Sequence, residues 1–494
     1  MAASYNLLTY QIHDLPAEEQ KARFLDFHTE WAEQPLAGVL SLRGYYVKIG
    51  QVVSNQPALL PKPYRKSLKI LQEKVPPEPF ERIRGIVEDE LGKIEDTFAA
   101  FDEVPLGAAS IGQVHEARLK EGGEEVVVKV QYPEAERFFE LDFAVMKLAL
   151  WYVNPELLDV VKKQQDIFAK EFDYKQEAAN LRRMVNEVGG RDFGKAAVTF
   201  PEPFEHLTTR KVLVMRKMGG KTLTKIGHEL IEELAKSRDM TVDEFNASTR
   251  KMILESKGKG MLPEKMGLSN TEFVLIRWWR WLRGQSVPPN GAELMKLLYA
   301  EKAYEIFQLG AFNADPHAGN IMLDQENNVV SLLDYGQLIT LSQEWRDTFA
   351  RYIIAIDDGD REEVLKQWKK LGNEWTWQVT GEVNPLNETY ACALFHFGGT
   401  RGVREGMKIL EIRGFKEVMD EFFKPKERRK IHITKTPPEY GLLQRACFCL
   451  AGVGMQIGFG RASPASMMRA GAEQYLKDRE REGWEGGGGG GGCS

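Results

Sequence analysis

The side chains best suited to chemistry in this sequence lie in two short segments. The DPHAGN segment (Asp315–Asn320) is followed, after a predicted strand, turn and strand, by the DYG segment (Asp334–Gly336). Mg²⁺ demands hard oxygen ligands and keeps few protein ones, leaving the rest of its shell to phosphates and water. Asn320 and Asp334 are therefore the predicted Mg²⁺ ligands, and Asp315 is predicted to face an attacking hydroxyl. Either segment alone would be interpreted as a turn rich in Asp, Gly and Asn, but the two together favour phosphoryl transfer.

A third candidate is Lys129, which lies within the apolar run Val126–Val130. Side chains alternate along a strand, and a lysine is expensive to bury without a partner. Kinases place such a lysine on the α- and β-phosphates of ATP and pair it with a helix glutamate. The preceding Gly112-Gln113-Val114 matches the end of a glycine-rich loop at the right distance, which favours this interpretation over a surface lysine.

Acidic partners for such cations are Glu171, Asp173 and Glu177, in a helix predicted from Pro155 to about Val188. At about 100° per residue, Asp173 and Glu177 share a helix face, whereas Glu171 lies well round from Glu177. One helix could thus present carboxylates to two different cations. A solvated charged face is the alternative, because lysines are adjacent.

Composition limits the other functions open to the chain. Its 494 residues carry a formal net charge of -6, which gives no support for nucleic acid as the main partner. The four cysteines form no C-x-x-C pair, so neither a zinc site nor a disulfide framework is expected. Neither a targeting peptide nor an apolar run long enough to span a membrane is predicted. The best such run, Leu442–Phe459, is interrupted by Arg445 and is interpreted as a buried helix.

The order of predicted elements defines an α+β fold. Helices are expected over 36–75 and 79–100, then a strand, turn and strand from 101 to 132, and a short strand near Val214. Most of the chain beyond 223 is predicted to be helical, apart from the strands around the DPHAGN and DYG segments. The predicted parts are an N-terminal helical extension (1–100), a small β-rich lobe (101–222), a mainly helical lobe (223–480) and a flexible glycine-rich tail (481–494).

Together these motifs resemble the UbiB-like (aarF-domain) atypical kinase family, which is linked to coenzyme Q and other isoprenoid-lipid biology. The resemblance covers roughly residues 36–355. Lys48-Ile49-Gly50-Gln51 is similar to the K-x-G-Q signature of the family, and Glu171-Phe172-Asp173 to its E-x-D motif. Gly107-Ala108-Ala109-Ser110 occupies the position of its alanine-rich loop. The departures are Ala318, where the family usually has a second proline, Gly107 at the first loop position, and Arg216, where an acid is common.

The resemblance implies a protein-kinase-like two-lobe fold that binds ATP, or ADP, together with Mg²⁺. Lys129 would pair with Glu177 and act with Asp315 in catalysis, while Lys48 would enter the nucleotide site, meet Glu171 or Asp173, and form a regulatory extension with Gln51. The implied nucleotide contacts are Gly107, Ala108, Ala109, Ser110, Lys129, Met215 and Met218. The implied partners are a lipid or quinone precursor, a membrane surface and the proteins of a biosynthetic complex, in a mitochondrion or a plastid.

The sequence after the DYG segment bears on the phosphoryl acceptor. It passes almost at once into a helix-like stretch, with no A-P-E motif and no long activation segment of the kind that docks a peptide. This favours ATP hydrolysis or a small-molecule or lipid-linked acceptor. The alternatives are a protein kinase with an unusual substrate site and a non-catalytic nucleotide-binding scaffold.

Overall fold

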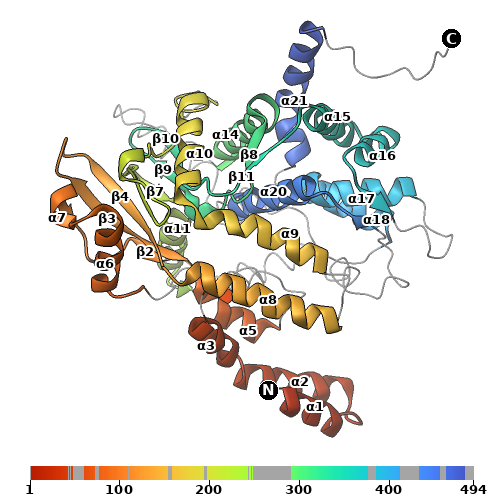
Figure 1. Ribbon diagram of the computed structural model, residues 1–494. Coiled ribbons are helices and arrows are strands. Elements are labelled where there is room, and N and C mark those ends of the chain that lie inside the picture. The colour runs from red at the N-terminus through yellow and green to blue at the C-terminus, as the bar shows by residue number, and fades with distance from the viewer. Residues whose placement is uncertain are drawn as a thin grey trace. The chain divides into compact units, whose positions relative to one another are not determined.

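The chain forms two compact units in a computed structural model (Figure 1). Unit 1 comprises residues 1–178 and 203–217, and unit 2 comprises residues 179–202 and 218–494. Helix α10 (Tyr174–Glu187) contributes its residues up to Ala178 to unit 1 and the rest to unit 2. The structure describes residues 2–42, 44, 46–47, 50, 61–72, 77–108, 111–153, 158–193, 197–242, 244–245, 248, 291–375, 385–411, 433–456 and 463–483.

Unit 1 contains an antiparallel sheet in the order β1-β3-β4-β6, with β2 paired to β3. Its strands are β1 (Phe98–Phe101), β2 (Gly107–Ala108), β3 (Gly112–Leu119), β4 (Glu125–Gln131) and β6 (Val212–Arg216). In the central strand β4, Val126, Val128 and Val130 are fully buried, while Lys129 points to the other face. The predicted strand, turn and strand and the predicted strand near Val214 are thereby confirmed.

Helices of unit 1 cover the buried face of this sheet. Apolar side chains of α6 (Phe80–Leu91) and α8 (Ala135–Val153) form one cluster with the valines of β4, and Figure 1 shows α6 beside the sheet. The remaining helical elements of this unit are α1 (Ala2–Gln11), α2 (Ala17–Glu30), α3 (Glu33–Leu42), α5 (Lys62–Leu68), η1 (Lys69–Gln72), α7 (Ile94–Thr97), α9 (Leu158–Ala169), η3 (Lys170–Phe172) and η4 (Glu205–Leu207).

Two predictions about helices need correction, and one helix was not predicted. The helix expected over 79–100 ends at Leu91, because Gly92 adopts a φ of 86°, and β1 already begins at Phe98. The helix expected over 155–188 is interrupted at Asp173, which has an extended backbone. Helix α8 was not predicted, since its apolar residues lie on a buried and an exposed face and so give no single stripe.

Unit 2 combines a small sheet with a mainly helical body. The sheet has the order β5-β10-β9-β7, in which β10 is parallel to β5 and antiparallel to β9, and β8 pairs with β11. The strands are β5 (Ala197–Thr199), β7 (Lys221–Thr222), β8 (Ala311–Asn313), β9 (Ile321–Asp324), β10 (Val329–Leu332), β11 (Leu338–Thr340) and, apart from these, the pair β12 (Glu374–Trp375) and β13 (Ile433–Lys435).

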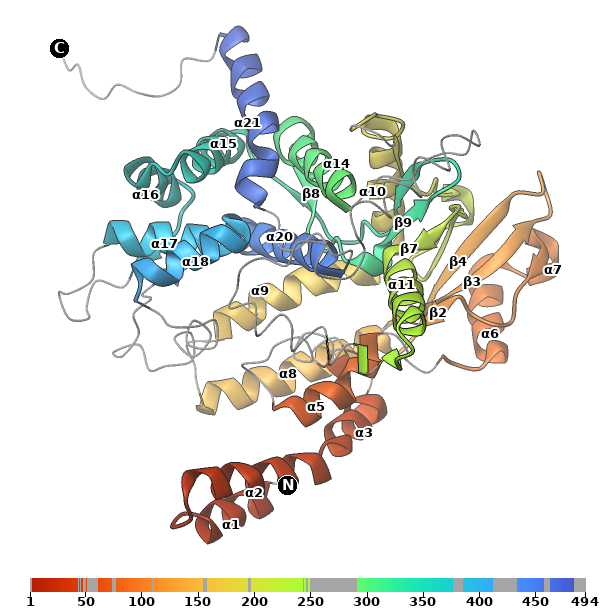
Figure 2. The same ribbon diagram turned by 180° about the vertical axis from the view of Figure 1, so that it is seen from behind.

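The helices of unit 2 pack around aromatic residues such as Phe349, Phe397 and Tyr440. Helix α21 lies against α14 and α15, as both views show (Figure 2). The helices are α11 (Leu223–Ser237), α14 (Gly291–Tyr304), the π-helical turn η6 (Glu305–Leu309), η7 (Ala318–Asn320), α15 (Gln343–Asp358), α16 (Arg361–Lys370), α17 (Pro385–Phe397), α18 (Gly399–Ile409), α20 (Pro438–Gln456) and α21 (Pro464–Arg481). Helix α20 confirms the buried helix predicted around Arg445.

None of the helices in the described ranges is both long and apolar enough to cross a membrane.

Candidate functional site

The DPHAGN segment leaves β8 and returns to the sheet through one short helical turn, η7. His317 begins this turn, and its Nδ1 accepts a hydrogen bond from the Gly319 N–H at 3.2 Å. The Asn320 carbonyl then accepts the Leu333 N–H at 2.9 Å, one residue before the DYG segment. The hairpin β9–β10 thus returns the chain so that Asn320 lies next to the start of the DYG segment.

Asn313, at the end of β8, joins the two segments directly. Its Oδ1 accepts the Asp315 N–H at 2.9 Å, and its Nδ2 donates to the Asp334 carbonyl at 2.7 Å. The amide side chain suits this position because it carries both an acceptor and two donors. The Asp334 carboxylate in turn accepts the Gly336 N–H at 3.0 Å, which sets its direction. Asp315, Asn320 and Asp334 are therefore brought together within unit 2.

A buried polar cluster lies behind these segments. The side chains of Glu301, Lys302 and Glu305, from α14 and η6, are almost wholly excluded from solvent, and Lys302 forms an ion pair with Glu305. The Tyr335 hydroxyl of the DYG segment donates to Glu305 at 2.7 Å. Burial, and then the nearby carboxylate of Glu305, raise the pKa of Glu301 well above its ordinary value.

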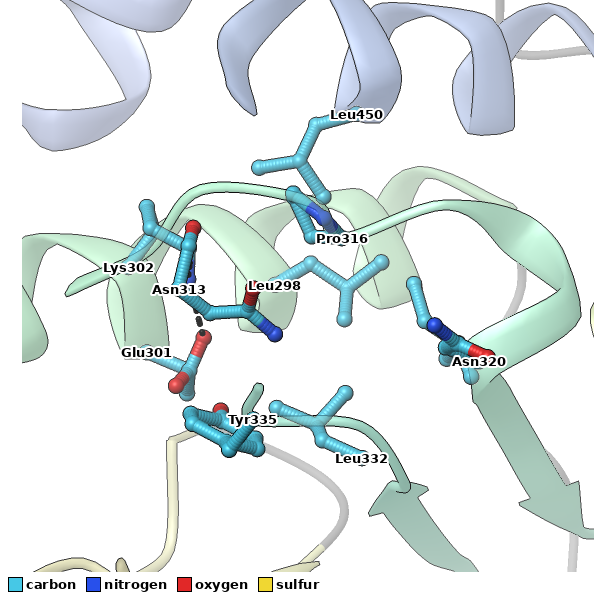
Figure 3. Close-up of a pocket in the computed structure, with 10 residues that line it drawn as sticks. Leu298, Glu301, Lys302, Asn313, Pro316, Asn320, Leu332, Tyr335 and Leu450 are labelled. Carbon is cyan, nitrogen blue, oxygen red and sulfur yellow. Dashed lines mark hydrogen bonds and ion pairs between the residues drawn. The ribbon is translucent and has the colours of Figure 1, made fainter. Parts of the chain in front are cut away.

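A cavity of about 10 Å³ opens between this cluster and the DPHAGN segment (Figure 3). Figure 3 shows Glu301, Lys302 and Asn313 on one side of the cavity and Asn320 on the other. The volume is that of about one water molecule. Glu301 lines this space, and its buried Oε1 has no hydrogen bond within the described part of the chain.

Helix α20 supports the DPHAGN segment from another side. Arg445 donates from Nε to the Ala314 carbonyl at 3.0 Å and also bonds the Gln337 side chain. One turn further, the Cys449 thiol donates to Asp315 Oδ1 at 3.9 Å. Burial, and then the Asp315 carboxylate, raise the pKa of the Cys449 thiol to about 12, so it remains a neutral donor.

Lys129 and Glu177 form a close ion pair within unit 1. Lys129 Nζ donates to both carboxylate oxygens of Glu177, at 2.8 and 2.9 Å, and lies 5.1 Å from the centre of the Tyr174 ring. The Glu177 side chain is 3% exposed and that of Lys129 is 18% exposed. The pairing implied by the family resemblance is present, and a role in holding nucleotide remains a prediction.

The other acidic residues are placed differently from the sequence prediction. Asp173 does not share a helix face with Glu177, because it precedes α10 and its Oδ1 accepts the Lys175 and Gln176 N–H groups at 3.0 and 3.3 Å. Asp173 therefore satisfies two amides of the first turn of α10, which have no helical acceptor. Glu171 lies in η3, before the break.

The predicted nucleotide contacts are only partly described. Gly107 and Ala108 form β2 opposite Val114 and Gln113, and Met215 lies in β6 opposite Val127. Met218 follows β6 and belongs to unit 2. Lys48, Gln51, Ala109 and Ser110 lie outside the described residues.

The donor set fits Mg²⁺ held largely by phosphate and water. Among the described residues, no group of three or more His, Cys, Asp or Glu side chains could hold a metal ion by itself. Asn320 and Asp334 offer an amide and a carboxylate oxygen on adjoining backbone, which suits a cation that takes its other ligands from a nucleotide.

These features define a protein-kinase-like protein: a β-rich unit with a strand lysine paired to a helix glutamate, and a mainly helical unit with the two loop motifs. The ABC1 atypical kinase-like domain matches residues 70–258 and 288–368, more than half of the chain. The chain belongs to this family. The resemblance to aarF-domain kinases and the α+β kinase-like fold are thereby confirmed.

Curated relatives carry kinase names. The chain is 26% identical over 431 residues to Protein ACTIVITY OF BC1 COMPLEX KINASE 8, chloroplastic, of Arabidopsis thaliana, covering 84% of this chain and 48% of that protein. It is 26% identical over 403 residues to AarF domain-containing protein kinase 1 of Gallus gallus, covering 79% of this chain and 64% of that protein. The chain thus spans about half to two thirds of the length of these relatives.

Two solved structures are similar at low identity. The complex of Rv3197 with erythromycin from Mycobacterium tuberculosis matches with a TM-score of 0.48 and 19% identity, over 93% of this chain and 98% of that one. ROP2 from Toxoplasma gondii, described as having a protein-kinase fold and no enzymatic activity, matches with a TM-score of 0.26 and 12% identity, over 88% of this chain and 96% of that one.

Proposed function

We propose that this protein is an atypical kinase or ATPase that binds ATP with Mg²⁺ and acts in isoprenoid-quinone or other lipid metabolism. The observation that carries the proposal is the double hydrogen bonding of Asn313, which holds Asp315 and the Asp334 backbone together. Such positioning is most of what a phosphoryl-transfer site must provide, because the reaction needs little covalent help from the protein.

Each residue has a distinct role in this proposal. Asn320 and Asp334 hold Mg²⁺, which neutralises the phosphate oxygens when bound, and Asp315 orients the acceptor hydroxyl or water. Lys129 holds the α- and β-phosphates, and Glu177 keeps its ammonium in place through the two hydrogen bonds described above. The nucleotide also contacts the segment from Gly107 to Ser110, Met215 and Met218.

The short connection after the DYG segment supports a small or lipid-linked acceptor, or water. Only residues 337–342, which include β11, lie between Gly336 and α15, and all of them are described. Ser342 then starts α15 by accepting the Trp345 N–H. This stretch leaves no room for a long segment that docks a peptide.

Partners and compartment belong to the same proposal. The words "complex kinase" and "chloroplastic" in the name of the Arabidopsis relative support a plastid location and an association with other proteins. A mitochondrial location is the other compartment that the family resemblance implies. Lys48 and Gln51 are proposed to regulate the site together with Glu171 and Asp173, at a membrane surface.

The test is Mg²⁺-dependent ATP turnover by the full chain, with and without lipid vesicles and a quinone-precursor mimic. Asp334→Asn should lower turnover by about 100-fold or more, because it removes a charged Mg²⁺ ligand. Asp360→Asn is the matched control: Asp360 begins α16 by accepting the Glu363 N–H, and Asn serves equally well there. Lys48→Ala should change turnover if the extension regulates the site.

Three outcomes would redirect the proposal. Nucleotide binding without turnover under any condition would favour a non-catalytic scaffold. Transfer of phosphate to a protein in trans, lost in Asp315→Asn, would favour a protein kinase. Equal losses in Asp334→Asn and Asp360→Asn would show that the first substitution acts through folding rather than through the metal.

A further inference from the structure

Glu305 occupies an unusual place in the helix that precedes the DPHAGN segment. It is the first residue of the π-helical turn η6, directly after α14, and it is 0% exposed. π-helical turns within helices are rare and frequently lie at functional sites. Gly310, with a φ of 69°, ends this turn immediately before β8.

The Glu305 carboxylate binds both segments of the site at once. Oε2 accepts the Asn313 N–H at 3.1 Å and the Lys302 ammonium, and Oε1 accepts the Tyr335 hydroxyl at 2.7 Å. Asn313 is the residue that holds Asp315 and Asp334, and Tyr335 is the residue after Asp334. The bond to Asn313 therefore reaches both Asp315 and the Asp334 backbone, and the bond to Tyr335 reaches the residue next to Asp334.

We propose that Glu305 is a positioning residue that sets the DYG segment against the DPHAGN segment, so that Asp334 is fixed for Mg²⁺ relative to Asp315. This inference rests on the proposed function and assigns it a residue outside both motifs. Glu305 touches neither metal nor nucleotide and acts through Asn313 and Tyr335.

Stability alone does not account for this cluster. A buried ion pair such as Lys302–Glu305 can often be replaced by apolar side chains without loss of stability, since burial of the charges offsets their attraction. What apolar side chains cannot supply is an acceptor for both the Asn313 N–H and the Tyr335 hydroxyl. The third ionisable group, Glu301, approaches Lys302 only to 3.9 Å, and the hydrogen bonds of the Asn313 N–H and the Tyr335 hydroxyl go to Glu305.

The test compares two tyrosines that each lose only a hydroxyl. Tyr335→Phe removes one bond to Glu305, while Tyr352→Phe removes an equally buried bond, to the Tyr440 hydroxyl at 2.7 Å, in the helical body of unit 2. The measurement is ATP binding by the full chain as a function of Mg²⁺ concentration, together with ATP binding in EDTA. Tyr335→Phe should raise the half-saturating Mg²⁺ concentration about 3- to 10-fold and leave binding in EDTA unchanged. Tyr352→Phe should lower the melting temperature without moving the Mg²⁺ dependence.

Glu305→Gln provides a second variant. It keeps the size of the side chain but turns one acceptor into a donor, so it should raise the half-saturating Mg²⁺ concentration more than Tyr335→Phe does. If Glu305→Gln fails to fold, the tyrosine comparison decides alone. An unchanged Mg²⁺ dependence in Tyr335→Phe, or equal shifts in Tyr335→Phe and Tyr352→Phe, would overturn the proposal.

The outcome separates this inference from the proposed function. If the wild-type protein shows no Mg²⁺-dependent ATP binding, the proposed function fails, and positioning is then judged by hydrogen exchange of residues 311–321 and 332–337. Faster exchange there in Tyr335→Phe but not in Tyr352→Phe would support the positioning role, and no difference would overturn it.

Discussion

The ion pair between Lys129 and Glu177 makes a quantitative prediction about unit 1. Lys129→Met removes the ammonium and keeps most of the stem, leaving the carboxylate of Glu177 with only 3% of its side chain exposed. Glu177→Met leaves the ammonium of Lys129, whose side chain is 18% exposed and can be partly hydrated. We therefore expect Lys129→Met to be the more costly of the two substitutions.

The magnitudes follow from these exposures. Breaking a fully buried ion pair costs about 3 to 5 kcal/mol, and breaking an exposed one costs about 0 to 1 kcal/mol. Because one partner is buried and the other partly solvated, Lys129→Met should cost about 3 kcal/mol and Glu177→Met about 1.5 kcal/mol. The double variant leaves neither charge, so it should lower the free energy of unfolding by only about 2 kcal/mol. This is about 2.5 kcal/mol less than the sum of the two single costs, and the difference is the coupling energy between the two positions.

Native-state hydrogen exchange of the β4 amides is the suitable assay, since a chain of two units need not unfold in one step. Lys217→Met serves as a matched control in the same unit. Lys217 bonds Glu116 at the same 2.8 Å, but the two side chains are 33% and 30% exposed, so its loss should cost less than about 1 kcal/mol. Additive costs for the Lys129 and Glu177 substitutions, or an equal cost for Lys217→Met, would refute the reasoning.

Three further predictions concern a backbone contact, a buried histidine and a half-buried thiol. Gly112→Ala should destabilise unit 1 by more than about 2 kcal/mol in urea unfolding, because a Cβ there would lie 2.3 Å from the Val130 carbonyl oxygen; a smaller loss would mean that the strands separate easily. Burial lowers the pKa of His115 below its ordinary 6.5, so the unfolded chain takes up a proton first. The stability of unit 1 should therefore hold above pH 6.5 and fall as the pH drops below it. The measurement is the free energy of unfolding at pH 7.5 and at pH 5.5, and the difference between the two values should be smaller in His115→Gln. With its pKa raised to about 12, the half-buried Cys449 thiol should resist alkylation at pH 8 in the native protein and react after denaturation. Mass spectrometry showing equal rates would contradict the contact of this thiol with Asp315.

Much of the fold could be predicted from local patterns. Alternation in Glu125–Gln131 and the apolar run of Val212–Arg216 mark two strands of unit 1, because a strand places successive side chains on opposite faces whatever lies beyond. The helix break at Asp173 was missed for a related reason. Its side chain bonds the Lys175 and Gln176 N–H groups, and this local competition with the helix outweighs a helical period that continues on either side.

The candidate site also contains residues that the sequence predicts and residues that it does not. Type and spacing predict Asp315, Asn320, Asp334 and Lys129 as site residues, because a phosphoryl-transfer site needs those groups in short segments. The sequence does not single out Asn313, although it lies only two residues from Asp315, because an asparagine ahead of a turn resembles any other turn residue.

By itself, the sequence determined the chemical inventory and the short elements that carry it: the DPHAGN and DYG segments, the strand lysine and the membership of one family. Tertiary structure alone decided what holds these groups in place. Arg445 reaches the Ala314 carbonyl, Tyr335 reaches Glu305, and Lys129 reaches Glu177, each across many intervening residues. The physical reason is that periodicity and turn chemistry act over a few residues, whereas a buried polar group takes whichever partner the folded chain brings within hydrogen-bond distance.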